Sequence, residues 1–510
     1  MIIIGKAIKG TIVLNEKLRK PDNIKFSQQK TLLKLVKKAK KTTFGEEFDF
    51  SKILSSSDPE KSFRENVPIY DYDSIYDQWW KYSLLGKEDI CWPGKVKYFA
   101  LSSGTSGSPS KRIPITHDMI RTIKKAGFNH LSSVKNHPVD KNIYSTQMLL
   151  LGGSTELEKN VKQYSGDLSG ILTANLPLWL NFIYKPGAVI SKEKDWNAKI
   201  MKIVIEAPKW NIGIISGVPS WVKLLIEKII EYHQVDNIHE IWPNFSVLSH
   251  GGVSLKPYKD GFEKLFGKKV YFLETYLASE GFIAYEKIAG EGMSLVFGNG
   301  IYYEFIPFDD AHFSSEGKLI SSNGVVNYDN IEEGKEYALL ISTCAGAWRY
   351  LIGDTVKFIQ GKLIITGRTR HFLSLCGEHL SVDNMNDAIR ELSKTLLSNI
   401  NEYAVAGVNF KYGFAHKWYL SAKDSDVNVE KCEELLDNEL KNLNDDYKTE
   451  RKSVLIKVKV IFVPENLFYN WMEAENKIGG QAKFPRVLNA KQLDSWEKHL
   501  QLNGIKTEIE

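Results

Sequence analysis

Cysteine is scarce in this sequence, with four residues in a chain of 510. Cys91, Cys344, Cys376 and Cys432 lie far apart and lack the paired spacing that a metal site needs. Their spacing indicates reduced thiols of a cytoplasmic protein rather than a disulfide framework. A Gly-x-Ser-x-Gly elbow is also missing, and no convincing Ser/His/Asp or Cys/His set takes its place. Catalysis through a covalent protein nucleophile is therefore not expected.

Long hydrophobic runs and a strong charge imbalance are absent too. The longest uncharged window, 168–184, is interrupted by Pro177 and two asparagines and falls short of a comfortable membrane span. Residues 2–4 are too short for the apolar core of a signal peptide. The net charge of +5 is slight, and the lysines of 34–41 are interleaved with apolar residues, as on the solvated face of an amphipathic helix. We therefore expect a cytoplasmic protein without a nucleic-acid or membrane partner.

The sequence does contain a regular alternation of helix and strand patterns. At 510 residues the chain exceeds one compact core, so at least two domains are expected. Between Trp196 and Glu291, apolar stripes at helical spacing alternate with short buried runs. The predicted helices begin at Trp196, Pro219 and Tyr258, and the predicted strands are 212–215, 245–248 and 270–273. This order predicts an α/β domain with mainly parallel sheets covered by helices.

The pattern changes after Gly367-Arg368. Beyond it the sequence predicts helices from Val382 and Val429 and strands near 404–410, 418–422 and 456–462. These elements form an α+β unit of about 140 residues, a usual size for a domain. We therefore divide the chain into a large N-terminal domain, 1–368, and a small mobile C-terminal domain, 369–510, with a hinge near 369–370.

One loop, within 98–114, is rich in small residues and hydroxyls. A short apolar run leads into Ser-Ser-Gly-Thr-Ser-Gly-Ser-Pro-Ser, which Lys111 and Arg112 follow. Gly104 lets the backbone bend, and bent backbone N–H groups form a concavity that holds anions. The loop is not a Walker motif, because Ser110 rather than glycine precedes the lysine. It predicts a phosphate cradle with cations at its rim, and the alternative is a flexible surface loop.

Two acidic residues lie in segments that suggest binding. Glu280 ends Tyr-Leu-Ala-Ser-Glu, beyond the strand predicted at 270–273. Its carboxylate suits Mg²⁺ that also contacts substrate phosphates, and the alternative is an acid that caps the next helix. Asp354 follows Gly353 in a predicted tight turn, where a carboxylate can accept two hydrogen bonds from ribose hydroxyls. The alternative for Asp354 is a solvent-facing turn.

Two further loops belong to the same group of signals. The glycines at 479–480 predict a mobile loop that carries Lys483 and Arg486 to an anion on closure, and the alternative is that these cations are merely solvated. Ser-His-Gly-Gly at 249–252 follows a predicted strand, where ligands of parallel sheets bind. We assign this loop to the adenine or acyl side of a site and expect a structural role for His250.

Taken in order, these segments resemble a known family. Ser-Ser-Gly-Thr-Ser-Gly-x-x-x-Lys, Tyr-x-Ala-Ser-Glu-Gly and Arg-Tyr-x-x-Gly-Asp are similar to motifs of the GH3 family of acyl-acid amido synthetases. That family belongs to the superfamily of adenylate-forming enzymes, which includes firefly luciferase and acyl-CoA synthetases. The resemblance covers nearly the whole chain, because further similar segments are 63–69, 302–307, 367–368, 377–379 and 479–486.

The resemblance implies the two-domain adenylating fold and a site for ATP and Mg²⁺. Contacts to the ATP phosphates are implied for Ser102, Ser103, Thr105 and Lys111. The implied adenine and α-phosphate site contains Tyr276, Ala278 and Ser279, the ribose site contains Asp354 and Arg368, and Tyr303 is expected near the nucleotide. Glu280 is implied as the Mg²⁺ ligand, and Lys483 is expected to arrive from the small domain and stabilise charge during adenylation.

The implied function is ATP-dependent amide synthesis. A small carboxylic acid attacks the α-phosphate, pyrophosphate leaves, and the acyl group passes from the adenylate to the amine of an amino acid. One alternative is an acyl-CoA ligase or a loader of carrier proteins, which shares the adenylation step. A second alternative is a non-catalytic nucleotide-binding module. The motifs select neither the acid, nor the acceptor, nor the oligomeric state.

Overall fold

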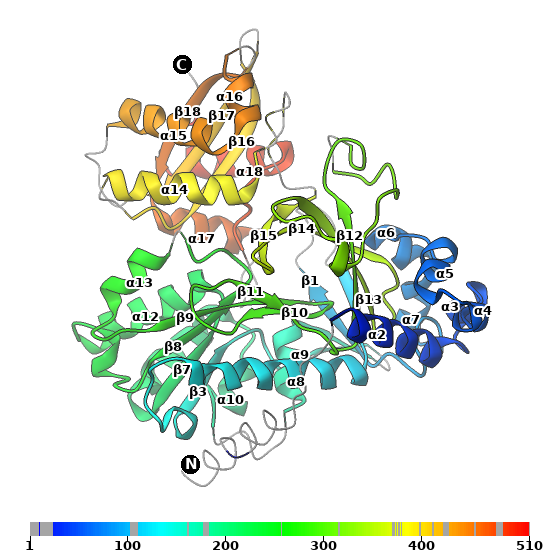
Figure 1. The fold of residues 1–510 in the computed structure, drawn as a ribbon. Coiled ribbons are helices and arrows are strands. Elements are labelled where there is room, and N and C mark those ends of the chain that lie inside the picture. The colour runs from blue at the N-terminus through cyan, green and yellow to red at the C-terminus, as the bar shows by residue number, and fades with distance from the viewer. Residues whose placement is uncertain are drawn as a thin grey trace.

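The structure is a computed structural model that describes most of the chain. The described residues are 10, 24–102, 111–160, 163–176, 183–256, 258–314, 317–369, 373, 375, 378, 380–396, 399–410, 413–421, 428–452, 455–475 and 483–508. They form a large N-terminal domain and a smaller C-terminal domain that lies above one end of it (Figure 1). Among the described helices, none is both long enough and apolar enough to cross a membrane.

An eleven-stranded sheet forms the centre of the large domain within the described residues. Its strand order is β12-β13-β14-β15-β11-β10-β9-β8-β7-β3-β6. The bounds, in chain order, are β3 Gln147–Leu151, β6 Tyr184–Lys185, β7 Ile212–Gly217, β8 Val247–Gly251, β9 Tyr271–Ala278, β10 Gly281–Glu286, β11 Met293–Leu295, β12 Ile301–Pro307, β13 Glu336–Thr343, β14 Tyr350–Ile359 and β15 Lys362–Arg368. The strands predicted at 212–215, 245–248 and 270–273 are confirmed as β7, β8 and β9.

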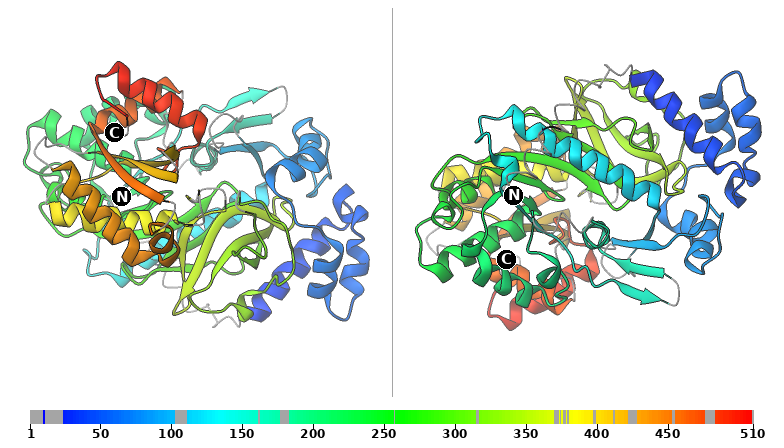
Figure 2. Two further views of the ribbon diagram at one scale, coloured as in Figure 1. Left: turned by 90° about the horizontal axis from the view of Figure 1, so that it is seen from above. Right: turned by 90° about the horizontal axis from the view of Figure 1, so that it is seen from below.

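Helices cover the half of this sheet that runs from β6 to β9. These strands pair in parallel, as the alternation of helices and strands predicted. The covering helices include α8 (His117–Ser133), α11 (Trp196–Glu206), α12 (Pro219–His233) and α13 (Lys259–Leu265), and Figure 2 shows α8 lying across one face. Pro219 stands in the first turn of α12, where its missing N–H costs nothing. The apolar stripe of α12 is fully buried, so helix and sheet share one core.

The other half of the sheet, from β9 to β12, is antiparallel. β9 and β10 form a hairpin in which Ala278 pairs with Gly281, so only Ser279 and Glu280 lie in the turn. The parallel arrangement expected from the sequence thus holds for only one half of the sheet. The strands of the other half are antiparallel because they follow one another without crossover helices. No helix follows Glu280, which rules out the helix-cap alternative for this residue.

A second sheet of four described strands has the order β2-β1-β5-β4. It contains β1 (Tyr98–Ser102), β2 (Lys111–Ile115), β4 (Glu158–Asn160) and β5 (Gln163–Gly166). β1 and β2 are antiparallel, and Ser102 pairs with Lys111. The Ser/Gly-rich segment 103–110, predicted as a phosphate cradle, lies outside the described residues. The sheet therefore brings the two ends of that segment together at one edge.

Helices near the N-terminus, most of them short, enclose an aromatic core. They are α2 (Ile24–Ala39), α3 (Thr43–Glu47), α4 (Phe50–Ser55), α5 (Pro59–Asn66), α6 (Tyr72–Ile75) and α7 (Lys81–Leu84). Trp348 stacks on Phe44 and meets Phe50 and Phe63 edge-on, which joins these helices to the turn before β14. The expected amphipathic helix at 34–41 is confirmed by α2, which buries Leu32, Leu35 and Val36.

The C-terminal domain is built on a three-stranded sheet with the order β16-β17-β18. Its elements are α14 (Val382–Leu396), β16 (Tyr403–Phe410), β17 (Gly413–Ser421), α15 (Val429–Leu443), α16 (Asp445–Glu450), β18 (Leu455–Val463), α17 (Glu465–Ala474) and α18 (Ala490–Leu502). The predicted helices and strands of this domain are confirmed. Trp221 of α12 contacts Tyr469 of α17 with ring centroids 5.5 Å apart, within a core that both domains share.

Candidate active site

A cleft of about 1780 Å³ lies where the two domains meet. Its walls come from the ends of β7, β8 and β9, from the β14–β15 hairpin, and from residues 483–487 of the C-terminal domain. Ligands of parallel sheets bind beyond the carboxyl ends of the strands, and this cleft occupies that position. Most of the predicted site residues that the structure describes line this cleft. The cleft is thus the candidate active site.

The candidates of the phosphate cradle meet the cleft through Lys111. This residue begins β2 and lines the cleft, and its ammonium lies 5.2 Å from the centre of the Tyr72 ring. Ser102 ends β1, whereas Ser103 and Thr105 lie outside the described residues. Lys111 therefore lines the cleft directly after the segment predicted to bind phosphate.

The β9–β10 hairpin carries four of the candidates, two at the end of β9 and two in its turn. Tyr276, Ala278, Ser279 and Glu280 all line the cleft. Glu280 is 9% exposed, and burial raises the pKa of its carboxyl, with Asp354 adding to the shift and the cations Lys111 and Arg368 opposing it. An acid buried in this way gains most from a cation bound beside it. The turn therefore presents a carboxylate that suits a metal ion.

Asp354 lies within β14 and not in a turn, which corrects the sequence-based prediction. The reason is that β14 and β15 form a hairpin in which Asp354 stands opposite Arg368. The Arg368 Nε lies 2.9 Å from the Asp354 Oδ1, and the Tyr276 hydroxyl donates to Oδ2. The carboxylate raises the pKa of Arg368 against the effect of burial. Strand pairing thus places Asp354 opposite Arg368, and the Tyr276 side chain reaches Asp354 from β9.

Lys483 enters the cleft from the C-terminal domain. A Cβ placed on Gly252 would come within 3.1 Å of the Lys483 Cε, and Gly252 has a φ of +88°. A side chain at Gly252 would therefore be strained and would press on the lysine. Desolvation lowers the pKa of Lys483 to about 8, the charge of Arg368 adds to this effect, and Asp354 opposes it. A negatively charged ligand bound beside this ammonium would raise its pKa again.

Arg486 has a different role from the predicted one. Its Nη1 donates to the Glu402 Oε2 at 2.8 Å and to the Tyr403 carbonyl, and its Nη2 donates to the Tyr258 hydroxyl at 3.0 Å. Tyr258 belongs to the large domain and in turn donates to Glu402. The anion that Arg486 meets is therefore a protein carboxylate. Arg486 anchors the segment that carries Lys483.

Tyr303 lies apart from the other candidates. It is buried in β12, outside the cleft lining, and its hydroxyl donates to the Val296 carbonyl at 3.1 Å. Its ring packs edge-on against Phe297. The resemblance placed Tyr303 near the nucleotide, but in this fold the strand directs its side chain into the core. We leave Tyr303 out of the proposed site.

The Ser-His-Gly-Gly segment, which ends β8 and starts the loop after it, borders the cleft as expected. Ser249, His250, Gly251 and Gly252 all line it. His250 is buried, and desolvation lowers its pKa to about 3, so the ring is neutral at ordinary pH. A neutral and very weakly basic ring suits a structural role, which agrees with the expectation for His250.

Sequence reasoning missed two residues beside the predicted ones. Tyr350 opens β14 and is hydrogen-bonded to Glu280, and it stood in the Arg-Tyr-x-x-Gly-Asp motif without an assigned role. Lys256 lines the cleft and contacts the C-terminal domain. Nothing in the sequence near Lys256 signals this contact, because its partners lie more than a hundred residues away.

The fold of this chain is similar to those of two solved ligases. Over 96% of both chains, the structure matches a GH3.15 acyl acid amido synthetase with a TM-score of 0.76 and 15% identity. It also matches 2-hydroxyisobutyryl-CoA ligase in its postadenylation state, with a TM-score of 0.59 and 14% identity over 93% of this chain and 91% of that one. Both likenesses concern the fold.

The chain belongs to the GH3 family. The family's N-terminal domain matches residues 14–160 and 153–270, its central domain matches 294–362, and its C-terminal domain matches 383–492.

Relatives in this family are named as synthetases. Two are the indole-3-acetic acid-amido synthetases GH3.4 and GH3.2 of Arabidopsis thaliana, each 22% identical over 69% of this chain. The alignments span 66% and 74% of those proteins, which for GH3.4 is just under two thirds. A third is the jasmonoyl--L-amino acid synthetase JAR6 of Nicotiana attenuata, 24% identical over 47% of this chain and 43% of its own length.

Proposed function

We propose that this protein is an ATP-dependent ligase that adenylates a small carboxylic acid and transfers the acyl group to an amino acid. The observation that carries the proposal is the meeting of Lys483 with Glu280, Asp354 and Arg368 at one cleft. Membership of the GH3 family and the names of its relatives support the same reaction.

The residues of the cleft fit a nucleotide and its metal ion. Gly251 lines the cleft and has no room for a Cβ, which would approach the Thr275 carbonyl of the neighbouring strand to 2.3 Å. Asp354 provides acceptors for ribose hydroxyls, with Arg368 holding it in place. Glu280 would hold Mg²⁺, which supplies positive charge to the phosphates. Lys111, with Ser102, Ser103 and Thr105, belongs to the proposed phosphate site, and Tyr276, Ala278 and Ser279 to the nucleotide wall.

The chemistry requires positioned charge and no protein nucleophile. A carboxylate is a poor acyl donor because oxide is a poor leaving group. When the carboxylate oxygen attacks the α-phosphate, the bond to pyrophosphate breaks, and the acyl group then carries AMP as its leaving group. Negative charge grows on the phosphates in this step, and we assign its stabilisation to Lys483, which enters the cleft. Moving Lys483 out of the cleft would weaken adenylation more than it weakens ATP binding.

The second half-reaction is an attack by an amine on the acyl carbon of the adenylate. The amine loses a proton, and AMP departs. We assign amino acids as acceptors because relatives are named amido synthetases and a jasmonoyl--L-amino acid synthetase. Coenzyme A is the alternative acceptor, since a CoA ligase shares the fold.

We also propose a cytoplasmic location and a hinge near residues 369–370.

The test measures both half-reactions in sequence. Purified protein is incubated with ATP, Mg²⁺ and a panel of aromatic, indolic and aliphatic acids, and pyrophosphate release is recorded. Acids that respond are then offered amino acids or coenzyme A, and products are identified by mass spectrometry. An amide product supports the proposal. A thioester without any amide identifies an acyl-CoA ligase, and ATP binding without pyrophosphate release identifies a binding module.

A further inference from the structure

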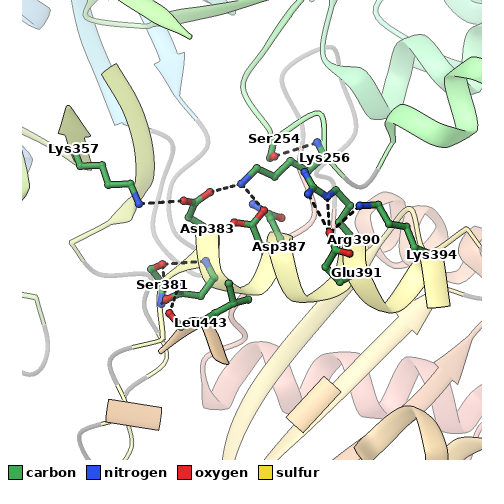
Figure 3. Close-up of polar contacts among 12 residues, drawn as sticks. Ser254, Lys256, Lys357, Ser381, Asp383, Asp387, Arg390, Glu391, Lys394 and Leu443 are labelled. Carbon is green, nitrogen blue, oxygen red and sulfur yellow. Dashed lines mark hydrogen bonds and ion pairs between the residues drawn. The ribbon is translucent and has the colours of Figure 1, made fainter. Parts of the chain in front are cut away.

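An ion-pair cluster joins the two domains next to the candidate active site. The Lys256 Nζ, in the loop after β8, lies 2.9 Å from the Asp383 Oδ1 and 2.7 Å from the Asp387 Oδ1 (Figure 3). Lys357 of β14 lies 3.7 Å from the second oxygen of Asp383. The two aspartates are one turn apart on α14, so they face the same side. Two segments of the large domain therefore attach to one helix of the small domain.

The cluster is partly shielded from water. The side chains of Lys256, Asp383 and Asp387 are 33%, 17% and 30% exposed. Burial disfavours the charged form of Lys256, but the carboxylates of Asp383 and Asp387 outweigh this effect and raise its pKa. Glu274 of β9 is also near Lys256, but burial and the charge of Glu286 raise the pKa of Glu274 to about 7, so it is only about half charged at pH 7. Lys256 therefore stays charged, and its attraction to α14 is screened less than that of an open surface pair.

A chain of contacts links α14 to Lys483. Asn386 of α14 accepts a hydrogen bond from the Tyr403 hydroxyl of β16 at 2.8 Å. The Tyr403 carbonyl accepts from Arg486, and Val405 donates its N–H to the Arg486 carbonyl at 2.8 Å. Lys483 stands three residues before Arg486 in the same segment. These contacts couple the position of α14 to that of the segment carrying Lys483, which Arg486 also joins to Tyr258 of the large domain.

We propose that Lys256 is a positioning residue that, by bridging Asp383 and Asp387, holds the small domain in the orientation that places Lys483 in the cleft. In this role the lysine acts through the domain interface. The inference rests on the proposed function, because it assigns Lys483 to adenylation. Its structural part, the control of domain orientation, can be measured without turnover.

The experiment reverses and then restores the charge pattern. Lys256→Glu places a third carboxylate beside two aspartates, and Lys256→Glu/Asp387→Lys re-creates one attractive pair. Acid-dependent ATP–pyrophosphate exchange is measured with ATP binding as a second readout. Lys209→Glu is the matched control, because the partner of Lys209 is Glu206 of its own domain. We expect exchange to fall about tenfold or more in the single variant, with ATP affinity changed less than about threefold, and the double variant to recover most of the loss.

Domain orientation is measured on the same variants by pulsed electron paramagnetic resonance. Spin labels at Glu231→Cys on α12 and Thr395→Cys on α14, with Cys376→Ser, report the distance between the domains. The inference predicts a shifted or broadened distance distribution for Lys256→Glu and a return toward the native one in the double variant. An unchanged distribution in Lys256→Glu, or no recovery in the double variant, would overturn it. Absence of exchange in the native protein would instead count against the proposed function, and the distance measurement would still decide the role of Lys256.

Discussion

The role of Lys483 gives a prediction that combines charge and pH. Its pKa is lowered to about 8, chiefly by desolvation. In the free enzyme the Lys483 side chain is therefore mostly charged below this pH and mostly neutral above it. The value of kcat/KM for ATP follows the ionisation of the free enzyme. For a single group with this pKa, about one tenth remains charged at pH 9. We therefore expect kcat/KM to fall about tenfold between pH 7 and pH 9.

The kcat profile is expected to differ from the kcat/KM profile. Bound polyphosphate favours the ammonium form and raises its pKa, so the decline in kcat begins at a higher pH. At pH 7, Lys483→Ala removes a charge contact to the transition state, which commonly costs about 10²- to 10³-fold in rate. ATP affinity is expected to change much less. The fall in kcat/KM above about pH 8, the alkaline limb of the profile, is expected to be absent from this variant, because the titrating lysine has been removed.

The assay is the initial rate of pyrophosphate release at fixed ionic strength. Lys483→Arg serves as a second variant, since a guanidinium stays charged across this range and removes the alkaline limb whatever its absolute rate. Lys498→Ala is the control, because that lysine pairs with Asp494 on an exposed face of the same domain. If Lys483→Ala kept both the native rate and the native limb, Lys483 would have no part in adenylation.

Three further predictions concern single residues. Asp354→Asn should weaken ATP binding about 10- to 100-fold, the range for losing a hydrogen bond to a charged group, as measured by calorimetry against the exposed control Asp329→Asn; equal affinity would remove Asp354 from the ribose site. Glu280→Gln should raise the Mg²⁺ concentration for half-maximal pyrophosphate release about tenfold or more, and an unchanged Mg²⁺ dependence would contradict its role as a metal ligand. The pKa of His250 is lowered in the fold by burial from 6.5 to about 3, so its contribution to stability is complete above pH 6.5 and is lost as the pH falls toward 3. Urea unfolding at pH 7.5 and pH 5 should show that His250→Asn, which cannot titrate, removes about 2 kcal/mol of the native acid destabilisation, and an identical loss in both proteins would refute the argument.

Local patterns predicted the elements of the fold well. The apolar stripe of α12 and the buried runs of β7 and β8 arise from neighbouring residues, so a short window contains the whole signal. The hairpin nature of β9 and β10 was missed because an antiparallel partner leaves no mark on a strand's own sequence. The same limit applied to Asp354, which was expected in a turn and stands opposite Arg368 in a hairpin.

The candidate site divides in the same way. Glycines, hydroxyls and charges in a fixed order were enough to indicate an adenylating enzyme, because each binding segment carries its own chemistry. By residue type, Tyr303 and Arg486 resembled the other candidates for the site. Tyr303 nevertheless lies in the core, and Arg486 is paired with Glu402. Which way a side chain points depends on strand pairing, and this is not a local property.

The sequence by itself determined the α/β class, the succession of helices and strands, and the family whose motifs it shares. Only the tertiary structure decided that Tyr276, Asp354 and Arg368 meet at one hairpin edge, and that Lys483 reaches them from another domain. It also decided that Lys256 faces two aspartates of α14. The physical reason is that the periodicity that predicts a helix or a strand involves only a few neighbouring residues. Ion pairs and strand pairing instead join residues that come close only when the chain has folded.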